Sequence, residues 1–297
     1  GNDAGGIPPD SGFVDVPPPP PDCLVANKPT VNIPAAAFTP GTLPTGATAT
    51  SEITADTTLN CDKNWLIQGN IYVRTGVTLT IAAGTTIFGD KTSNGGLYIQ
   101  PGAKIVANGR ADAPIVFTSS QAAGTRVAGD WRGLILMGKA PPTIANPLVV
   151  GDPLTTYSGA DAADISGSLR FVRIEYAALG IRLGGIGTGT SIDSVQVRKS
   201  TDDCFGVSGG TVNMSHLICQ APGDEAYQID NGYDGRLQFL VAQRTPAGPN
   251  HNGMNVNGSF VRAYNATFCG TTAANQGLGL QTRNGARLDL GNAIVTR

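Results

Sequence analysis

Apolar residues in the second half of this chain recur at nearly constant steps, and this repeat restricts the folds that the chain can adopt. One column of such residues consists of Val172, Val195, Leu217, Leu240, Ala266 and Ala293, at successive steps of 23, 22, 23, 26 and 27 residues. A second column consists of Ile181, Phe205, Tyr227, Met254 and Leu278. Each member has an apolar partner two positions later, which is typical of the inward face of a short strand.

Steps of this size, with glycine at the corners, predict an all-β fold in which the chain winds into the coils of a parallel β-helix. One coil cannot bury its apolar face alone, so neighbouring coils must stack to form the core. An antiparallel barrel would need hairpin turns every 8 to 12 residues or so and would not keep these columns. In the first half, Leu79–Gly89 aligns with Leu97–Gly109 at a spacing of 18, which pairs Leu79 with Leu97.

Composition separates the chain into three parts. The 40 glycines, the 20 prolines and a charged fraction of only 14% argue against a helical bundle, and eleven of the prolines lie before residue 45. We expect residues 1–22 to be a disordered or extended proline-rich tether, residues 23–60 an irregular N-terminal cap, and residues 61–297 the β-helix. The net charge of −2 offers no basic surface for nucleic acid.

Cysteine usage indicates an exported protein. The five cysteines form no C-x-x-C pair and only two histidines are present, which argues against zinc-ribbon and redox motifs. Disulfides in an extracellular protein explain the cysteines more simply. We expect Cys23 and Cys61 to be joined, fastening the N-terminal segment to the first coils. Cys269 follows the inward-facing Phe268 and should be the unpaired cysteine.

Several segments from Asn64 onward form a specific series of motifs. They include NWLIQGNIYVRTGVTLTIAAGTTIFG from Asn64, GDWRGLILMG from Gly129 and DNGYDGRLQF from Asp230. Together these segments resemble a family of bacterial cell-surface lipoproteins built on a right-handed parallel β-helix. The leader is similar to those of myxobacterial lipoproteins. The resemblance implies a location outside the cell or on the outer-membrane surface of a Gram-negative bacterium, with an N-terminal lipid anchor as the only membrane attachment. It implies no defined activity.

The most acidic place in the repeat is one corner of the predicted helix. Asp202 and Asp203 precede Phe205, and Asp224 and Glu225 precede Tyr227 in the same way. Because coils stack about 4.8 Å apart, the four carboxylates should lie within roughly 10 Å of one another. Three interpretations stay open: a solvated acidic corner, a calcium site with hard oxygen ligands, and a carboxylate pair for glycoside hydrolysis. The next two coils place at this corner His251-Asn252 and Asn275-Gln276.

The segment Thr201–Cys219 resembles the part of polygalacturonases in which an Asp-Asp-Cys turn precedes a strand and a later cysteine closes a disulfide. The resemblance implies that Asp202 and Asp203 are acid/base residues, with Asp224 as a third candidate. It also implies that Cys204 pairs with Cys219, and we expect this disulfide.

The chain departs from the polygalacturonase pattern at three places. Leu179-Gly180 stands where that family has a further aspartate, and Gly223-Asp224-Glu225 stands where it has Gly-His-Gly. Its substrate-binding Arg-Ile-Lys is not found downstream. The resemblance therefore supports the disulfide and the fold more than the activity.

Other candidates are weaker. His216 adjoins the inward Leu217, so we expect it on the outer surface. Trp65 and Trp131 are interpreted as packing residues. Gly184–Gly187 is followed by no helical pattern, which argues against a phosphate loop.

We predict a secreted or surface-tethered protein with a structural or adhesive role, which binds a polysaccharide or another surface protein and performs no catalysis. The alternative is a polysaccharide-degrading hydrolase or lyase of the pectin-active β-helix type. A third prediction is a subunit that stacks end to end into a fibre or homo-oligomer through its C-terminal coil, because the first column continues to Val295 without a capping pattern. Calcium is the one cofactor that the sequence indicates.

Overall fold

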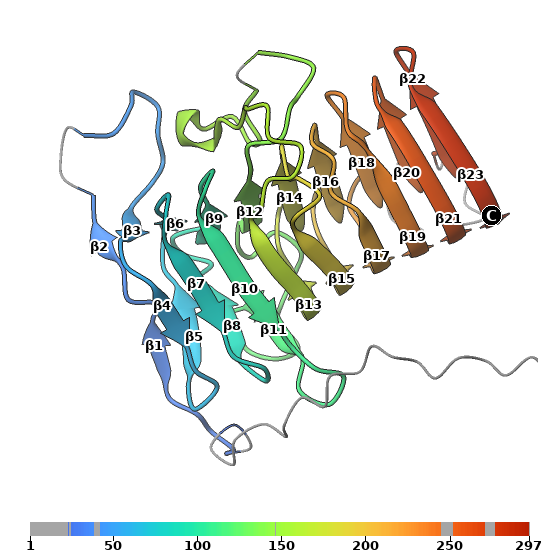
Figure 1. Cartoon of the computed structure of the whole chain (residues 1–297). Coiled ribbons are helices and arrows are strands. Elements are labelled where there is room, and N and C mark those ends of the chain that lie inside the picture. Colours follow the sequence, from blue (N-terminus) through green and yellow to red (C-terminus); the bar gives the residue numbers. More distant parts are fainter. Residues whose placement is uncertain are drawn as a thin grey trace, which may run out of the picture.

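The chain winds into a parallel β-helix, as the repeat predicts (Figure 1). The computed structural model describes residue 23 and residues 25–38, 42–145, 147–244, 252–270 and 277–296. Its strands form a 13-stranded sheet, called sheet A here, and a 10-stranded sheet, called sheet B. No helix within these ranges is long and apolar enough to cross a membrane.

Both sheets are built from short strands stacked coil upon coil. The strands of sheet A are β1 (Thr30–Asn32), β4 (Thr57–Leu59), β5 (Asn64–Ile67), β7 (Thr78–Ile81), β8 (Thr86–Gly89), β10 (Lys104–Asn108), β11 (Ile115–Ser119), β13 (Gly167–Glu175), β15 (Ser191–Arg198), β17 (Met214–Gln220), β19 (Asp234–Gln243), β21 (Phe260–Cys269) and β23 (Arg287–Thr296). Those of sheet B are β2 (Ala36–Ala37), β3 (Ser51–Ile53), β6 (Asn70–Val73), β9 (Gly96–Ile99), β12 (Gly133–Met137), β14 (Ile181–Gly184), β16 (Phe205–Ser208), β18 (Tyr227–Asp230), β20 (Met254–Asn257) and β22 (Leu280–Arg283).

The first predicted column is confirmed in full, because its six members pair in register from β13 to β23. The second column is confirmed from Ile181 to Met254, but its last member is wrong. Met254 pairs with Leu280, whereas Leu278 is 56% exposed. Leu278 and Leu280 form a better apolar i, i+2 pair than Leu280 and Thr282, which explains the shift of two residues.

The predicted 18-residue repeat in the first half is also wrong. Leu79 lies in sheet A and pairs with Ile105, whereas Leu97 lies in sheet B and pairs with Ile71. Both true steps are 26 residues (79 to 105 and 71 to 97). The alignment matched strands from different sheets, because both have the same alternating apolar pattern followed by a glycine corner.

From β13 onward each strand of sheet A has one residue in the left-handed region, which drops out of the pairing. These residues, with φ between 47° and 57°, are Phe171, Ser194, His216, Phe239, Asn265 and Asn292. The two halves of β13 pair with β10 and β11, which are separate strands. Two strands of an early coil are thus continued by one bent strand in the later coils.

Parallel pairing begins earlier than residue 61, where we expected the β-helix to start. β1 pairs with β5, β3 with β6 and β4 with β7. These strands lack an apolar run of their own, so the sequence did not distinguish them from an irregular cap. The expected disulfide between Cys23 and Cys61 is present, with 4.9 Å between the two Cα atoms. The predicted tether, residues 1–22, lies outside the described residues.

The inward side chains of both sheets form one continuous core along the helix. A smaller apolar cluster lies on the outer face of sheet B and comprises Tyr72, Tyr98, Ile135, Met137 and Tyr157. It is covered by the connection from β12 to β13, residues 138–166, which we call the strap (residue 146 is not described). Figure 1 shows the strap, in green, beyond the ends of β12 and β14.

Candidate functional site

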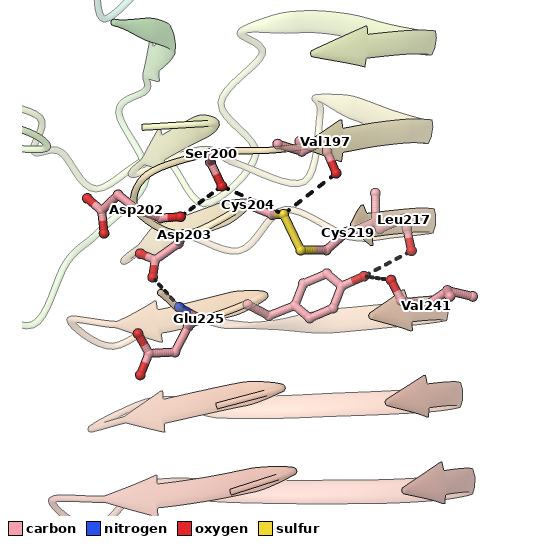
Figure 2. Close-up of a disulfide and its surroundings, with 10 residues drawn as sticks. Val197, Ser200, Asp202, Asp203, Cys204, Leu217, Cys219, Glu225 and Val241 are labelled. Carbon is pink, nitrogen blue, oxygen red and sulfur yellow. Dashed lines mark hydrogen bonds between the residues drawn. A yellow bond between two sulfur atoms is a disulfide. The ribbon is translucent and has the colours of Figure 1, made fainter. Parts of the chain in front are cut away.

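The acidic corner lies just before β16 and β18, where the chain turns from sheet A into sheet B. Figure 2 shows Asp202, Asp203 and Glu225 together on the same side of the two coils. Asp202, Asp203 and Asp224 each offer a carboxylate oxygen, and the three oxygens lie within 4.8 Å of one another. The prediction that the carboxylates of this corner lie close together is therefore confirmed for Asp202, Asp203 and Asp224.

Arg182 on β14 places a positive charge against this corner. Its Nη2 atom lies 2.6 Å from Asp202 Oδ2, and its Nη1 atom lies 2.5 Å from Asp203 Oδ2. The guanidinium lies over Gly206 on the neighbouring strand, where a Cβ atom would meet Nη1 at 1.9 Å. Gly206 therefore makes room for the arginine to reach both aspartates.

The buried Asp203 uses both carboxylate oxygens. Oδ2 accepts from Arg182, and Oδ1 accepts from the backbone N–H of Glu225 at 3.1 Å. Burial raises the pKa of Asp203 to about 6, with the charges of Asp202 and Asp224 adding to the rise and Arg182 opposing it. The side chain is therefore held as an ion pair and spans two coils.

Glu225 is also largely buried, and its carboxylate accepts from Asn252 Nδ2 at 2.9 Å. Burial, together with a hydrogen bond to Asp224 and the charge of that residue, raises the pKa of Glu225 to about 8. Asn252 also accepts from the backbone N–H of Leu278 at 2.8 Å. The corner thus links three successive coils through buried polar groups.

The carboxylates of Asp202, Asp203 and Asp224 are hard oxygen ligands of the kind that calcium prefers. Arg182 already contacts two of the three, so a divalent cation would have to share them with the guanidinium. The fourth predicted ligand, Glu225, accepts a hydrogen bond from Asn252. The calcium site formed by all four carboxylates stays a prediction.

The disulfide between Cys204 and Cys219 is present, with 5.7 Å between the Cα atoms (Figure 2). Cys204 lies in the corner, Cys219 points inward from β17, and both are fully buried. Cys269 is free and partly exposed, as expected. The disulfide therefore links the acidic corner to the core of the next coil.

Beside this corner the outer face of sheet B carries a pocket of about 420 Å³. Its polar floor includes Arg182, Ser208, Gln228, Asp230 and Asn231, from β14, β16, β18 and the turn after β18. Its apolar wall is formed by the strap residues Leu148, Val149 and Val150 and by Leu179. Asp202 and Asp203 lie at its edge.

Side-chain hydrogen bonds, in addition to backbone ones, hold the strap in place. Asp152 accepts hydrogen bonds from the backbone N–H of Thr48 at 2.8 Å and from its hydroxyl. Tyr157 Oη lies 2.5 Å from Ser208 Oγ, and Gly184 leaves the space beneath Tyr157 and Val149. The strap is therefore a fixed wall of the pocket.

Comparison with protein-family models finds a match to a family described as a pectate-lyase-like beta helix domain, over residues 51–297. The chain belongs to this family. No curated protein and no solved structure matches it. The match starts at the first residue of β3. This agrees with the observation that parallel pairing in this pectate-lyase-like β-helix begins before residue 61.

The remaining sequence candidates lie away from the pocket. His216 faces outward, as expected, with Nδ1 2.9 Å from Asp193 Oδ2 and its ring stacked on Phe239. Trp131 is fully buried and donates to the backbone oxygen of Glu175, and Trp65 donates to that of Asn60, so both are packing residues. His251 and Asn275-Gln276 lie outside the described residues.

Sequence reasoning missed the floor of the pocket. Arg182, Gly206, Gln228 and Asn255 occupy the outward position between the two members of each inward pair in the second column. Reading the column one residue later would have placed them on one face. The strap could not be found this way, because it lies in an insertion that interrupts the repeat.

Proposed function

We propose that this pectate-lyase-like β-helix binds a polysaccharide in the pocket on sheet B without cleaving it. The observation that carries the proposal is the engagement by Arg182 of Asp202 and Asp203, two of the three candidate catalytic aspartates. A general acid or base must exchange a proton with its substrate. Both oxygens of Asp203 already accept protein donors, so this side chain serves the fold.

The shape of the pocket supports sugar binding. One wall is apolar and the floor carries hydroxyl, amide and carboxylate groups, which together match the apolar faces and hydroxyl groups of a sugar ring. The floor continues beyond the pocket, because Gln228 pairs in register with Asn255 and Asn255 with Gln281. Asn255 donates to Gln228 at 2.9 Å, so the amides form a ladder along which an extended chain would lie.

Hydrolysis is the second candidate, and the acidic corner itself favours it. The pKa of Asp203 is raised to about 6 and that of Glu225 to about 8, and raised carboxyl pKa values are typical of general acids. The close approach of Asp202, Asp203 and Asp224 also suits a carboxylate pair.

Affinity electrophoresis of the full chain in gels that contain single polysaccharides, with reducing ends measured in parallel, separates the two functions. We expect at least one polysaccharide to retard the protein without release of reducing ends. Release that is lost in Asp203→Asn and Asp202→Asn but kept in Asp112→Asn, an exposed aspartate on another corner, would establish hydrolysis. Circular dichroism verifies that each variant is folded.

We further propose that the protein works outside the cell, tethered through its N-terminal segment to the surface of a Gram-negative bacterium. Its two disulfides support an oxidising compartment. Cell fractionation with thiol labelling tests this location. Recovery from the cytoplasm with all five cysteines reduced would contradict it.

End-to-end association through the C-terminal coil is a separate proposal. It is supported by β23, the last strand of sheet A, on which Ile294 and Val295 are 59% and 47% exposed. Sedimentation should shift to larger species with concentration, and Ile294→Lys should abolish the shift. A concentration-independent monomer would contradict association.

A further inference from the structure

The charges around the pocket restrict which polysaccharides it can accept, and this step rests on the proposed glycan-binding function. Two arginines and three aspartates line the pocket: Arg132, Arg182, Asp202, Asp203 and Asp230. Carboxylates therefore outnumber guanidinium groups at the place where a ligand would lie. A ligand carboxylate would meet like charges on the floor and at the edge of the pocket.

Arg182 is not free to bind a ligand carboxylate. Both terminal nitrogens of its guanidinium are within 2.6 Å of an aspartate oxygen, and the side chain is nine-tenths buried. Replacing the buried Asp203 by a ligand carboxylate would leave its charge without a partner in a buried place, which is strongly unfavourable. The charge of Arg182 is therefore neutralised by aspartates of the protein itself.

Arg132 lies on the border between this pocket and a second one, of about 350 Å³, that adjoins the strap from the other side. That second pocket is also lined by Asp152, a buried aspartate. Arg132 contributes one positive charge to the first pocket, which does not make the pocket positive overall because three aspartates line it as well.

The polar floor of the pocket can accept further hydrogen bonds. Asp230 Oδ2 accepts from Gln228 Nε2 at 3.3 Å, whereas the enclosed Oδ1 atom has no hydrogen-bond partner. An enclosed oxygen without a donor is unfavourable, and a hydroxyl group that entered from the pocket would relieve this cost. Acceptors of this kind suit the hydroxyl groups of a sugar.

We propose that the pocket selects an uncharged polysaccharide and rejects polyuronates. The excess of carboxylates, and the pairing of Arg182 with two of them, disfavour an anionic chain. Hydroxyl groups are the ligand groups that the floor can bind without displacing an existing ion pair. The family is described as pectate-lyase-like, and pectate is an acidic polysaccharide. The charges of this pocket do not favour binding of such an acidic chain.

The test uses glycans that differ only in charge, with binding to the full chain measured by calorimetry. The probes are oligogalacturonate and its carboxyl-reduced form, together with neutral xylan and glucan oligomers. We expect the neutral oligomers to bind, oligogalacturonate to bind at least about tenfold more weakly than its carboxyl-reduced form, and added salt to leave neutral binding unchanged. Asp230→Asn should reduce the difference in affinity between oligogalacturonate and its carboxyl-reduced form. The distant Asp112→Asn should leave this difference unchanged.

Each outcome separates the two proposals. Equal or tighter binding of oligogalacturonate than of its carboxyl-reduced form would overturn the selectivity and leave glycan binding intact. Failure of every probe and of a wider glycan array to bind would overturn glycan binding itself. If Asp230→Asn does not fold, Gln228→Ala provides a second variant, expected to weaken neutral binding at unchanged melting temperature.

Discussion

The early and later coils of this β-helix bury the same kind of core but are connected differently. In the early coils, β7 and β8, and then β10 and β11, are separate strands with their own corners. In the later coils each such pair is replaced by one bent strand with a single left-handed residue. The connection between the two inward pairs within sheet A therefore varies in length in the first region, whereas in the second it is always a single residue.

The candidate site lies where the two regions meet. The strap leaves β12, the last sheet B strand of the early coils, and covers strands that open the later coils. The regular coils supply the floor and the acidic corner, and the irregular connection supplies the apolar wall. A uniform repeat would give a flat polar face, so the pocket depends on the difference between the regions.

Loss of the Arg182 guanidinium should have the largest effect, because it acts at this junction. Arg182→Met keeps the bulk of the side chain but leaves Asp202 and Asp203 without their cation. Removing one partner of a buried pair costs about 3–5 kcal/mol of unfolding free energy. Urea denaturation at pH 7 should show this loss, and a smaller loss at pH 5, where the carboxyl groups are more readily protonated.

The exposed pair of Arg110 and Asp112 provides the control for that experiment. Arg110→Met should cost less than about 1 kcal/mol. Equal losses for the two variants would show that the junction has no special dependence on Arg182.

The two disulfides allow the regions to be compared directly. Cys23–Cys61 closes a loop of 38 residues in the early region and Cys204–Cys219 one of 15 in the later region. In the chain-entropy model they contribute about 4 and about 3 kcal/mol respectively. Serine substitution of each pair, followed by urea denaturation, should give losses in this order. A larger loss for Cys204 and Cys219 would mean that burial of the later disulfide matters more than loop length.

The pH dependence of the unfolding free energy should arise mainly in the later region, which contains the carboxyl groups with raised pKa values. Glu225 has a folded-state pKa of about 8, which is above its unfolded value, so the folded state holds a proton that the unfolded state releases between roughly pH 4.5 and 8. Asp203, at about 6, acts in the same direction. Unfolding free energy should therefore fall as pH rises through this range.

Glu225→Gln should flatten this fall, because the glutamine cannot lose a proton. Melting temperature measured from pH 5 to 8.5 tests the effect, with Asp112→Asn as the matched control. Stability that rises over this range in the wild-type chain, or a slope that Glu225→Gln leaves unchanged, would contradict the assignment.

The first column of the later coils could be predicted from sequence residue by residue, because a single left-handed residue in each sheet A strand keeps its inward pairs in register. The same reasoning failed in the early coils, where strands of different sheets share one pattern and Leu79 was matched with Leu97 instead of Ile105. The acidic corner was predicted because it belongs to the repeat. Arg182 was not, since its role depends on the space above Gly206 and on contacts between coils.

A crystal structure of the full chain with a neutral oligosaccharide tests the central claim most directly. We predict an intact oligosaccharide along the outer face of sheet B, in contact with Ser208, Gln228 and the strap, with the Arg182 ion pairs preserved. A cleaved product beside Asp202 and Asp203, or an oligosaccharide bound away from sheet B, would contradict the account.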